Sequence, residues 1–404
     1  MIRLRQWEQA SACAKAGAVT IGNFDGVHRG HARIIQRLRE QARAVGGPAV
    51  VFTFNPPPAA LLRPDQQPAP LTWLDRKARL LAELGVDVLV EYPTNFELLG
   101  LTAQEFFERV IVEQLAARGM VEGPNFYFGR GRTGDVRQLA QWCAERRMKF
   151  EVVPPLRDDQ EMLSSSRVRQ AVQNGDLAAV RQMLTRPYRV RGAVVRGAAR
   201  GAKIGFPTAN LSGLDTLLPA PGVYAGRAIW RGKVRSAAIH LGPIPTFDIA
   251  QSVLEVHLLD YAGDLYGERM EVELLARIRD VQRFSGIETL QQQLQRDVAA
   301  ARQLVDQEPS IESDEQWIEV RVGRRQGRKG ELLRAFADQL LFPSYFHENW
   351  DSWEECLRDL SWLPAGTGVR VIHDGEPLDE ESARDRTVYR EVLTACHGPR
   401  FLIE

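Results

Sequence analysis

The fold of the first part of this chain is decided by the stretch Gly22-Asn23-Phe24-Asp25-Gly26-Val27-His28-Arg29-Gly30-His31. An apolar run at 18–21 precedes it, and a segment follows whose apolar residues have helical spacing, namely Ile34, Ile35, Leu38 and Ala42. The pattern predicts a strand, a turn bounded by glycines and then a helix. Two imidazoles and a run of backbone N–H groups would lie at the positive end of that helix, where nucleotide phosphates bind well.

The two histidines of this turn form a His-x-Gly-His run that resembles the signature of nucleotidylyltransferases. Those enzymes transfer a nucleoside monophosphate from a triphosphate to an acceptor, and the flanking residues are similar to those of bacterial FAD synthetases. The alternative is a tight turn whose histidines only cap a helix, but so long a coincidental match is far rarer than a short one. The resemblance implies that His28 and His31 are catalytic and that ATP is bound by Gly22, Asn23, Phe24, Asp25 and Gly30.

The composition is that of an ordinary globular protein, with 44% hydrophobic and 26% charged residues among 404. That length predicts about three domains. The formal net charge of +0 argues against a dedicated nucleic-acid binder. We find no signal peptide and no apolar run of the ~20 residues that cross a bilayer, so we expect a cytoplasmic protein with no membrane partner. The four cysteines are far apart, which predicts neither a disulfide framework nor a zinc site.

Within a first domain of 1–186, residues 18–186 alternate between short apolar runs and amphipathic helical patterns. The expected elements are strands at 49–54, 86–92, 120–122 and 150–153 and helices at 75–83, 103–118 and 136–146. Such alternation is typical of α/β folds, and we expect a Rossmann-like parallel sheet with helices on both faces. A ligand site then lies at the carboxyl ends of the strands.

The pattern changes after residue 186. Residues 187–308 contain β-like runs separated by glycine- and proline-containing turns, which predicts a small β-barrel closed by an amphipathic helix. The expected strands are 188–195, 222–231, 233–241, 252–260 and 269–279, and the expected helix is 287–305. A polar stretch, 306–314, indicates a linker, and 314–404 indicates a separate small α/β domain.

A serine-rich run, Ser164-Ser165-Ser166-Arg167-Val168-Arg169, predicts a helix N-terminus that offers hydroxyl, N–H and guanidinium groups. It resembles the Ser-Ser-Thr-x-Ile-Arg motif of the FAD synthetases, which implies triphosphate binding by Ser164, Ser165, Ser166 and Arg169; a plain helix cap is the alternative. The same resemblance implies that Asn125 faces the nucleotide or the flavin. Pro57 stands where that family has a polar residue, so we expect weakened rather than absent adenylylation.

The stretch Gly205-Phe206-Pro207-Thr208-Ala209-Asn210 resembles the riboflavin kinase signature Gly-x-Pro-Thr-Ala-Asn. A threonine hydroxyl and an asparagine carbonyl are hard oxygen ligands, of the kind that Mg²⁺ takes beside ATP phosphates. The resemblance implies that Thr208 and Asn210 bind Mg²⁺ and that Gly205 and Pro207 line the flavin and nucleotide site. It also implies that 197–204 forms a flap over the nucleotide.

A strand-like run, Leu254-Glu255-Val256-His257, resembles the Glu-x-His strand of the same kinases. The resemblance implies that Glu255 is the general base that takes the proton from the 5′-hydroxyl of riboflavin; a solvent-facing carboxylate is the alternative. It further implies that Arg279 and Phe284 frame the flavin. The run 240–247 departs from the family, with His240 in place of Asn and Ile244 in place of Arg.

The C-terminal segment contains Phe346-His347-Glu348-Asn349-Trp350-Asp351, followed by an acidic helical pattern. It resembles the barstar family of small ribonuclease inhibitors. Residues 312–404 contain 19 Asp and Glu against 12 Lys and Arg, a net charge of −7, which suits a basic partner. The resemblance implies that Asp351 and Glu355 face a ribonuclease-like protein, and an inert domain is the alternative.

Together these resemblances predict a bifunctional enzyme that phosphorylates riboflavin with ATP to FMN and adenylylates FMN to FAD. Two alternatives remain open. One is a riboflavin kinase whose adenylyltransferase domain is weak or regulatory. The other is a binding or inhibitor protein whose function lies in the barstar-like domain.

Overall fold

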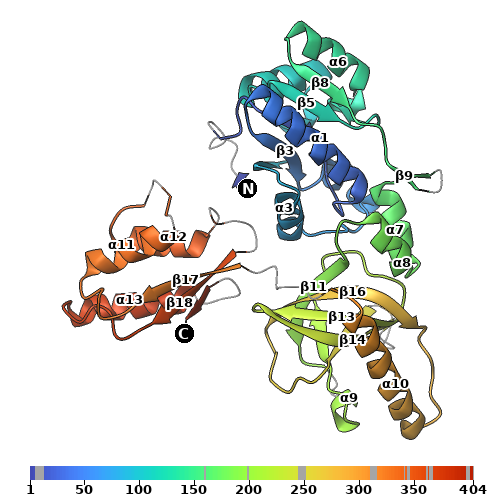
Figure 1. Ribbon diagram of the computed structural model, residues 1–404, viewed down its shortest axis with the longest axis vertical. Coiled ribbons are helices and arrows are strands. Elements are labelled where there is room, and N and C mark those ends of the chain that lie inside the picture. Colours follow the sequence, from blue (N-terminus) through green and yellow to red (C-terminus); the bar gives the residue numbers. More distant parts are fainter. Residues whose placement is uncertain are drawn as a thin grey trace. The chain divides into compact units, whose positions relative to one another are not determined.

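The computed structural model describes residues 1–4, 13–158, 161–197, 200–243, 252–309, 316–340, 342–343, 346–360, 363, 367–396 and 401–403. By its internal contacts the chain forms two compact units. One comprises Met1–Trp230 with Val234–Ser310, and the other comprises Arg231–Lys233 with Ile311–Glu404 (Figure 1).

The first unit begins with a parallel sheet in the order β1-β4-β3-β2-β5-β8. Its strands are β1 (Ile2–Leu4), β2 (Ala18–Ile21), β3 (Ala49–Asn55), β4 (Val88–Pro93), β5 (Gly119–Glu122) and β8 (Lys149–Val152). The chain moves outward from β2 through β3 to β4 and then returns to the other side of β2 at β5. The strand order therefore reverses between β2 and β5, and ligands of doubly wound sheets bind at the carboxyl ends of such strands. The predicted Rossmann-like sheet is confirmed.

Helices cover this sheet on both faces, and every residue of its central strands β2 and β5 is buried. Helix α1 (Arg29–Val45) contacts β2, β3 and β5 (Figure 1). The other helical segments are α2 (Pro58–Leu62), η2 (Pro64–Gln66), α3 (Leu74–Glu83), α4 (Phe96–Gly100), α5 (Ala103–Phe106), η3 (Phe107–Gln114), η4 (Arg130–Arg132), α6 (Val136–Glu145), α7 (Ser165–Gln173) and α8 (Leu177–Met183). Short strand pairs lie between them: β6 (Tyr127–Phe128) with β7 (Gly134–Asp135), and β9 (Arg157–Asp158) with β10 (Glu161–Met162).

The helix predicted at 103–118 is shorter and irregular. It begins with a capping box between Thr102 and Glu105 and changes from the α-helix α5 to the π-helix η3 at Phe107. Phe107 and Ile111 are fully buried in the same core as Phe52 of β3.

The second part of this unit is a closed barrel in the order β11-β12-β15-β14-β13-β16, which confirms the predicted barrel. Its elements are β11 (Tyr188–Val195), α9 (Arg200–Lys203), β12 (Ala209–Ser212), β13 (Gly222–Trp230), β14 (Lys233–Pro243), β15 (Ser252–Leu258), β16 (Arg269–Arg279) and α10 (Ile287–Asp306). The sequence did not predict β12, which is four residues long. All residues of β13 are buried, and this strand contacts α10.

The second compact unit is a three-stranded parallel sheet in the order β17-β18-β19 with three helices in its described residues. Its elements are β17 (Gln316–Val322), α11 (Lys329–Leu340), α12 (Trp350–Asp359), β18 (Thr367–His373), α13 (Ala383–Cys396) and β19 (Phe401–Ile403). Phe336 of α11 and Trp353 of α12 are fully buried and pack edge to face at 5.0 Å between ring centroids. The predicted α/β class of this segment is confirmed.

Candidate active sites

The turn at the carboxyl end of β2 is held in a specific shape by its own backbone and by two later segments. Phe24, Gly26 and Val27 have left-handed φ values of 46°, 82° and 40°. The carboxylate of Asp25 accepts hydrogen bonds from the amides of Leu71 at 3.0 Å and Thr72 at 3.1 Å. These bonds fix the turn at the reversal point of the sheet, where the sequence predicted a ligand site.

The two histidines lie on top of one another at the start of α1. Their rings stack with centroids 3.6 Å apart, and the Nδ1 of His28 accepts from the amide of His31 at 3.3 Å, so His28 also caps the helix. Gly30 favours this arrangement, since a Cβ there would crowd the His28 ring at 3.0 Å.

Both histidines are neutral at physiological pH. Burial lowers the pKa of His28 from 6.5 to about 4. The pKa of His31 lies well below its usual value, because of burial first and then because its charged form would be repelled by a protonated His28 and by Lys77. The pair can therefore donate and accept hydrogen bonds around a phosphate, but it does not supply positive charge.

The serine-rich run lies beside this turn. Ser164 caps α7 by accepting from the amide of Arg167 at 3.3 Å, and the Ser165 hydroxyl donates to the Asp25 carbonyl at 2.8 Å. The guanidinium of Arg169 is ion-paired with the Asp25 carboxylate. Ser166 is exposed. The structure thus brings two predicted motifs, 22–31 and 164–169, to one place, with Asp25 and Arg169 bound to each other.

Asn125 lines a cavity of about 640 Å³ at the carboxyl ends of β2 and β3. Gly22 and Asn23 of the turn also line it. Its lining further includes five aromatic rings and three arginines, namely Phe54, Phe106, Phe126, Tyr127 and Phe128 with Arg63, Arg130 and Arg132. A space with aromatic walls and three guanidinium groups suits a flat aromatic ligand with negative charge. Pro57 precedes α2 and makes no side-chain hydrogen bond.

The barrel places three polar side chains in one row across neighbouring strands. Asn210 of β12 pairs with Glu255 of β15, and Glu255 pairs with His240 of β14. Residues that face each other across strands point to the same side of a sheet. The Nδ1 of His240 is 3.7 Å from the Oε2 of Glu255, and both side chains are part-exposed, at 42% and 38%. The neighbours Leu254 and Val256 are buried in the barrel, so Glu255 points out of it.

The turn that carries Thr208 is anchored to the same strand. The Nδ1 of His257 is 2.8 Å from the carbonyl oxygen of Pro207, and Asn210 donates to the Thr208 carbonyl at 3.4 Å. A Cβ on Gly197 would come within 2.4 Å of the Asn210 amide, so this glycine lets the backbone approach. Residues 198–199 of the predicted flap and 244–247, including Ile244, lie outside the described residues.

The two further flavin-site candidates are adjacent to each other. The guanidinium of Arg279 lies 5.7 Å from the centroid of the Phe284 ring and is bound by the carboxylate of Asp297 in α10, with distances down to 2.6 Å. Gly205 has a left-handed φ of 89° and precedes the Pro207–Thr208 turn.

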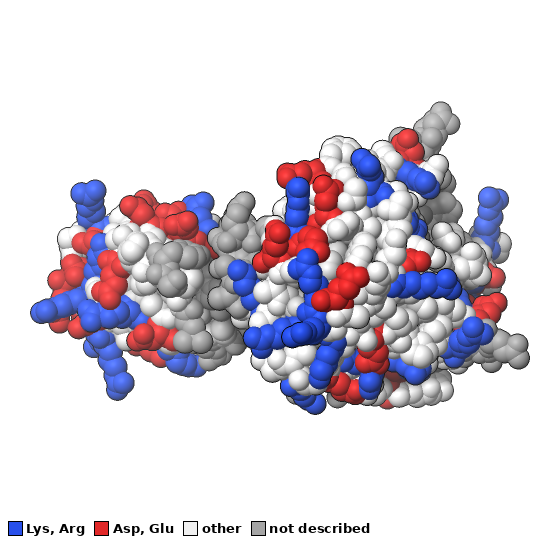
Figure 2. Space-filling view, turned by 90° about the horizontal axis from the view of Figure 1, so that it is seen from above, with Lys and Arg blue, Asp and Glu red and all other residues white. Residues whose placement is uncertain are grey.

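In the second unit, Asp351 and Glu355 are exposed and lie one turn apart on α12. Asn349 caps this helix by accepting from the amide of Ser352 at 2.9 Å, and the buried Trp353 fixes its other face. The two acids therefore share the solvent-facing side of α12. Acidic and basic side chains both occur on the face seen in Figure 2.

Comparison with known proteins assigns all three segments. A family model described as FAD synthetase matches residues 10–167, one described as riboflavin kinase matches 184–305, and one described as barstar (barnase inhibitor) matches 319–398. The bifunctional riboflavin kinase/FMN adenylyltransferase of Escherichia coli K12 is 38% identical over 302 residues, which cover 74% of this chain and 96% of that protein. This chain belongs to that family.

The chain is also similar to another member of the bifunctional riboflavin kinase/FMN adenylyltransferase family and to a solved structure. The protein of Bacillus subtilis is 33% identical over 285 residues, which cover 69% of this chain and 89% of that protein. A crystal structure described as a macrolide-efflux protein from Streptococcus pneumoniae has a TM-score of 0.68 and 31% identity, and covers 75% of this chain and 99% of its own. Among the described helices of this family member, none is long and apolar enough to cross a membrane.

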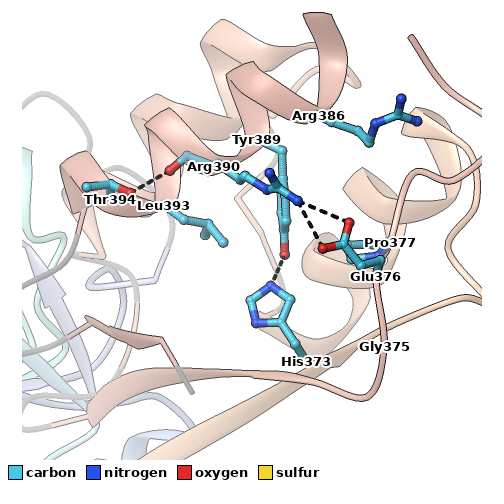
Figure 3. Close-up of a pocket in the computed structure, with 9 residues that line it drawn as sticks. All are labelled: His373, Gly375, Glu376, Pro377, Arg386, Tyr389, Arg390, Leu393 and Thr394. Carbon is cyan, nitrogen blue, oxygen red and sulfur yellow. Dashed lines mark hydrogen bonds and ion pairs between the residues drawn. The ribbon is translucent and has the colours of Figure 1, made fainter. Parts of the chain in front are cut away.

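The second compact unit of this chain also contains a cavity, between the end of β18 and α13 (Figure 3). Its volume is about 490 Å³. The Tyr389 hydroxyl lies 2.9 Å from the Nε2 of His373, and Arg390 pairs with both carboxylate oxygens of Glu376 at 3.0 Å. Burial raises the pKa of Tyr389. These groups satisfy one another.

Proposed function

We propose that this chain makes FMN from riboflavin and ATP, and then FAD from FMN and ATP, at two separate sites. In the first step the riboflavin 5′-oxygen bonds to the γ-phosphorus and ADP leaves. In the second an FMN phosphate oxygen bonds to the α-phosphorus and pyrophosphate leaves. The main support is that residues distant in sequence meet as two polar clusters, one around His28 and Asp25 and one around Glu255 and Asn210.

At the kinase site we assign Glu255 as the general base for the 5′-hydroxyl proton. Its support is an outward, part-exposed carboxylate beside Asn210. The hydroxyl of Thr208 and the amide oxygen of Asn210 suit Mg²⁺, which is bound by few protein oxygens together with substrate phosphates. No group of three or more His, Cys, Asp or Glu in the described residues offers a different metal site. When bound, Mg²⁺ neutralises charge on the ATP phosphates. Gly205 and Pro207 shape the turn, and Arg279 with Phe284 frames the flavin.

At the adenylyltransferase site we assign the neutral pair His28 and His31 to hydrogen bonds with the α-phosphate, and Ser164, Ser165 and Ser166 to the triphosphate beside them. Asp25 and Arg169 hold the two motifs together through their ion pair. The cavity lined by Asn125 and aromatic rings is assigned to the flavin of FMN. Pro57 contributes no donor there, which favours a slower reaction.

The experiment that tests this function is product analysis by flavin chromatography after incubation of the full chain with riboflavin, ATP and Mg²⁺. We expect FMN first and FAD later. FMN without FAD would support the alternative of a kinase with a silent adenylyltransferase domain, and no phosphorylated flavin would overturn the proposal.

We also propose the domain limits 1–186, 187–308 and 314–404. We further propose a cytoplasmic location, which the four free cysteines favour.

For the barstar-like unit we propose a basic, ribonuclease-like protein partner. Its support is the acidic charge of this segment and the exposed pair Asp351 and Glu355. Barnase is a suitable probe: we expect the full chain to inhibit it in a salt-sensitive way and the double change Asp351→Lys, Glu355→Lys to remove inhibition. Asp338→Lys, the same change at an exposed position of α11, is the control. Absence of inhibition at low salt would contradict this partner class.

A further inference from the structure

The adenylyltransferase site binds the most highly charged part of its substrates, yet three of its predicted phosphate ligands offer little free positive charge. His28 and His31 are neutral because burial lowers the pKa of each. Arg169 is already ion-paired with Asp25. A triphosphate bound by these three residues therefore needs a cation from elsewhere in the site, since buried negative charge without a counter-charge is strongly unfavourable.

Lys77 of α3 is a buried cation in this place. Its exposed fraction is 5%, and within the described part of the chain its ammonium makes no hydrogen bond and no ion pair. The start of α3 is attached to the site, because the amides of Leu71 and Thr72 hold the Asp25 carboxylate just before the helix begins. Lys77 is close enough to His31 for its charge to act on that ring.

The charged groups around Lys77 already have other partners. Asp25 and Glu91 act on Lys77 electrostatically, and so does Arg3. Asp25 is paired with Arg169, and Glu91 is paired with Arg3. Burial lowers the pKa of Lys77, while these two carboxylates favour its charged form. Asp25 and Glu91 each have an arginine partner, and neither forms an ion pair with the Lys77 ammonium in the described residues.

We propose that Lys77 is a phosphate-binding cation of the adenylyltransferase site, with the triphosphate of ATP as the counter-ion that its ammonium lacks. This inference rests on the proposed formation of FAD. As the bond from the FMN oxygen to the α-phosphorus forms and the bond to the bridging oxygen breaks, the electron pair of that bond goes to pyrophosphate. Lys77 keeps its proton and stabilises the negative charge that grows on the leaving group.

The test replaces Lys77 in the full chain by Met, which has a similar shape and no charge. We expect Lys77→Met to lower kcat/KM for FAD formation by about 10²–10³-fold, the usual effect of removing one electrostatic contact to a transition state. Lys77→Arg should restore part of it, and FMN formation should stay unchanged. The melting temperature should stay the same or rise, because an unpaired buried charge destabilises a fold.

The neighbouring Arg79 provides the control. It lies on the same helix, is also buried, and is ion-paired with Glu271 of β16. Arg79→Met leaves that carboxylate without one of its partners, so it should lower the melting temperature while FAD formation by the folded enzyme persists. A structural Lys77 would behave like Arg79 and a phosphate ligand would not.

A second measurement does not depend on turnover. Pyrophosphate should raise the melting temperature of the parent chain, and this rise should be absent in Lys77→Met. If Lys77→Met forms FAD at the parent rate, or gains the same thermal shift from pyrophosphate, the inference is overturned while the proposed function stands. If the parent chain forms no FAD, the proposed function fails, and the pyrophosphate shift alone still decides whether Lys77 binds phosphate.

Discussion

The two catalytic regions of the first unit use their polar residues in opposite ways. In the adenylyltransferase region the predicted ligands contact one another: His28 stacks on His31, and Asp25 pairs with Arg169. In the barrel, Glu255 and His240 are part-exposed and separated by 3.7 Å. The buried residues around His28 and Asp25 hold the turn that we propose binds phosphates, whereas the exposure of Glu255 leaves this proposed base accessible to an alcohol substrate. Changes in the first region should therefore affect both shape and chemistry, and changes in the second should affect chemistry alone.

The largest expected effect is at Glu255. Glu255→Gln removes a base without a change of shape, so FMN formation should fall by about 10²–10⁴-fold while supplied FMN is still converted to FAD. Rates measured separately with riboflavin and with FMN give the comparison. A variant that phosphorylates riboflavin at nearly the parent rate would remove Glu255 from the mechanism.

Replacement of both histidines should have the opposite selectivity, with loss of FAD formation and not of FMN formation. His28→Ala with His31→Ala removes the imidazole contacts to the α-phosphate, so FAD formation should fall by about 10²–10³-fold while FMN formation continues. His28 also caps α1, so the melting temperature should be followed in parallel. Equal loss of both activities would mean that the two regions are not independent.

The burial of His28 should also make the stability of the fold depend on pH. The pKa of His28 is about 4 in the folded protein and near 6.5 in the unfolded chain. The unfolded chain thus binds the proton first as the pH falls, which destabilises the fold between these values. Between about pH 7 and about pH 5, the unfolding free energy of the parent protein should fall by about 2 kcal/mol more than that of the variant His28→Gln, which has no imidazole to protonate. No difference between the two proteins would contradict a neutral, buried His28.

The smallest effect is expected at His240. Its part-exposed contact with Glu255 is of a kind that contributes about 1 kcal/mol or less, so His240→Asn should change kcat for FMN formation by about fivefold or less. The loss of FMN formation in Glu255→Gln, measured under the same conditions, is the reference. A loss as large as that of Glu255→Gln would make His240 part of the catalytic machinery.

Much of the fold and the motif positions could be predicted because hydrophobic periodicity and glycine-rich turns are local. The barrel strands β11 and β16 begin and end where their patterns predict. The short β12 was missed because its four residues overlap the Pro-Thr-Ala-Asn motif and have no period of their own. The change of the 103–118 helix to η3 was also missed, because the apolar spacing of this segment does not distinguish an α-helix from a π-helix.

The chemistry of the site was less accessible to sequence reasoning, because it depends on contacts between distant residues. The pairing of Asp25 with Arg169 joins positions 144 residues apart. The row from Asn210 through Glu255 to His240 exists only once the strand register is known. Lys77 lies in an amphipathic helical pattern, where a lysine normally faces solvent, and its burial follows only from the way α3 packs.

The central claim is that one chain contains two independent sites that act in succession, and a mixing experiment tests it most directly. Glu255→Gln alone should form almost no FAD from riboflavin, and neither should His28→Ala with His31→Ala. Mixed together with riboflavin, ATP and Mg²⁺, the two variants should form FAD, because FMN released by one is adenylylated by the other. A mixture that accumulates FMN and forms no FAD would contradict the claim.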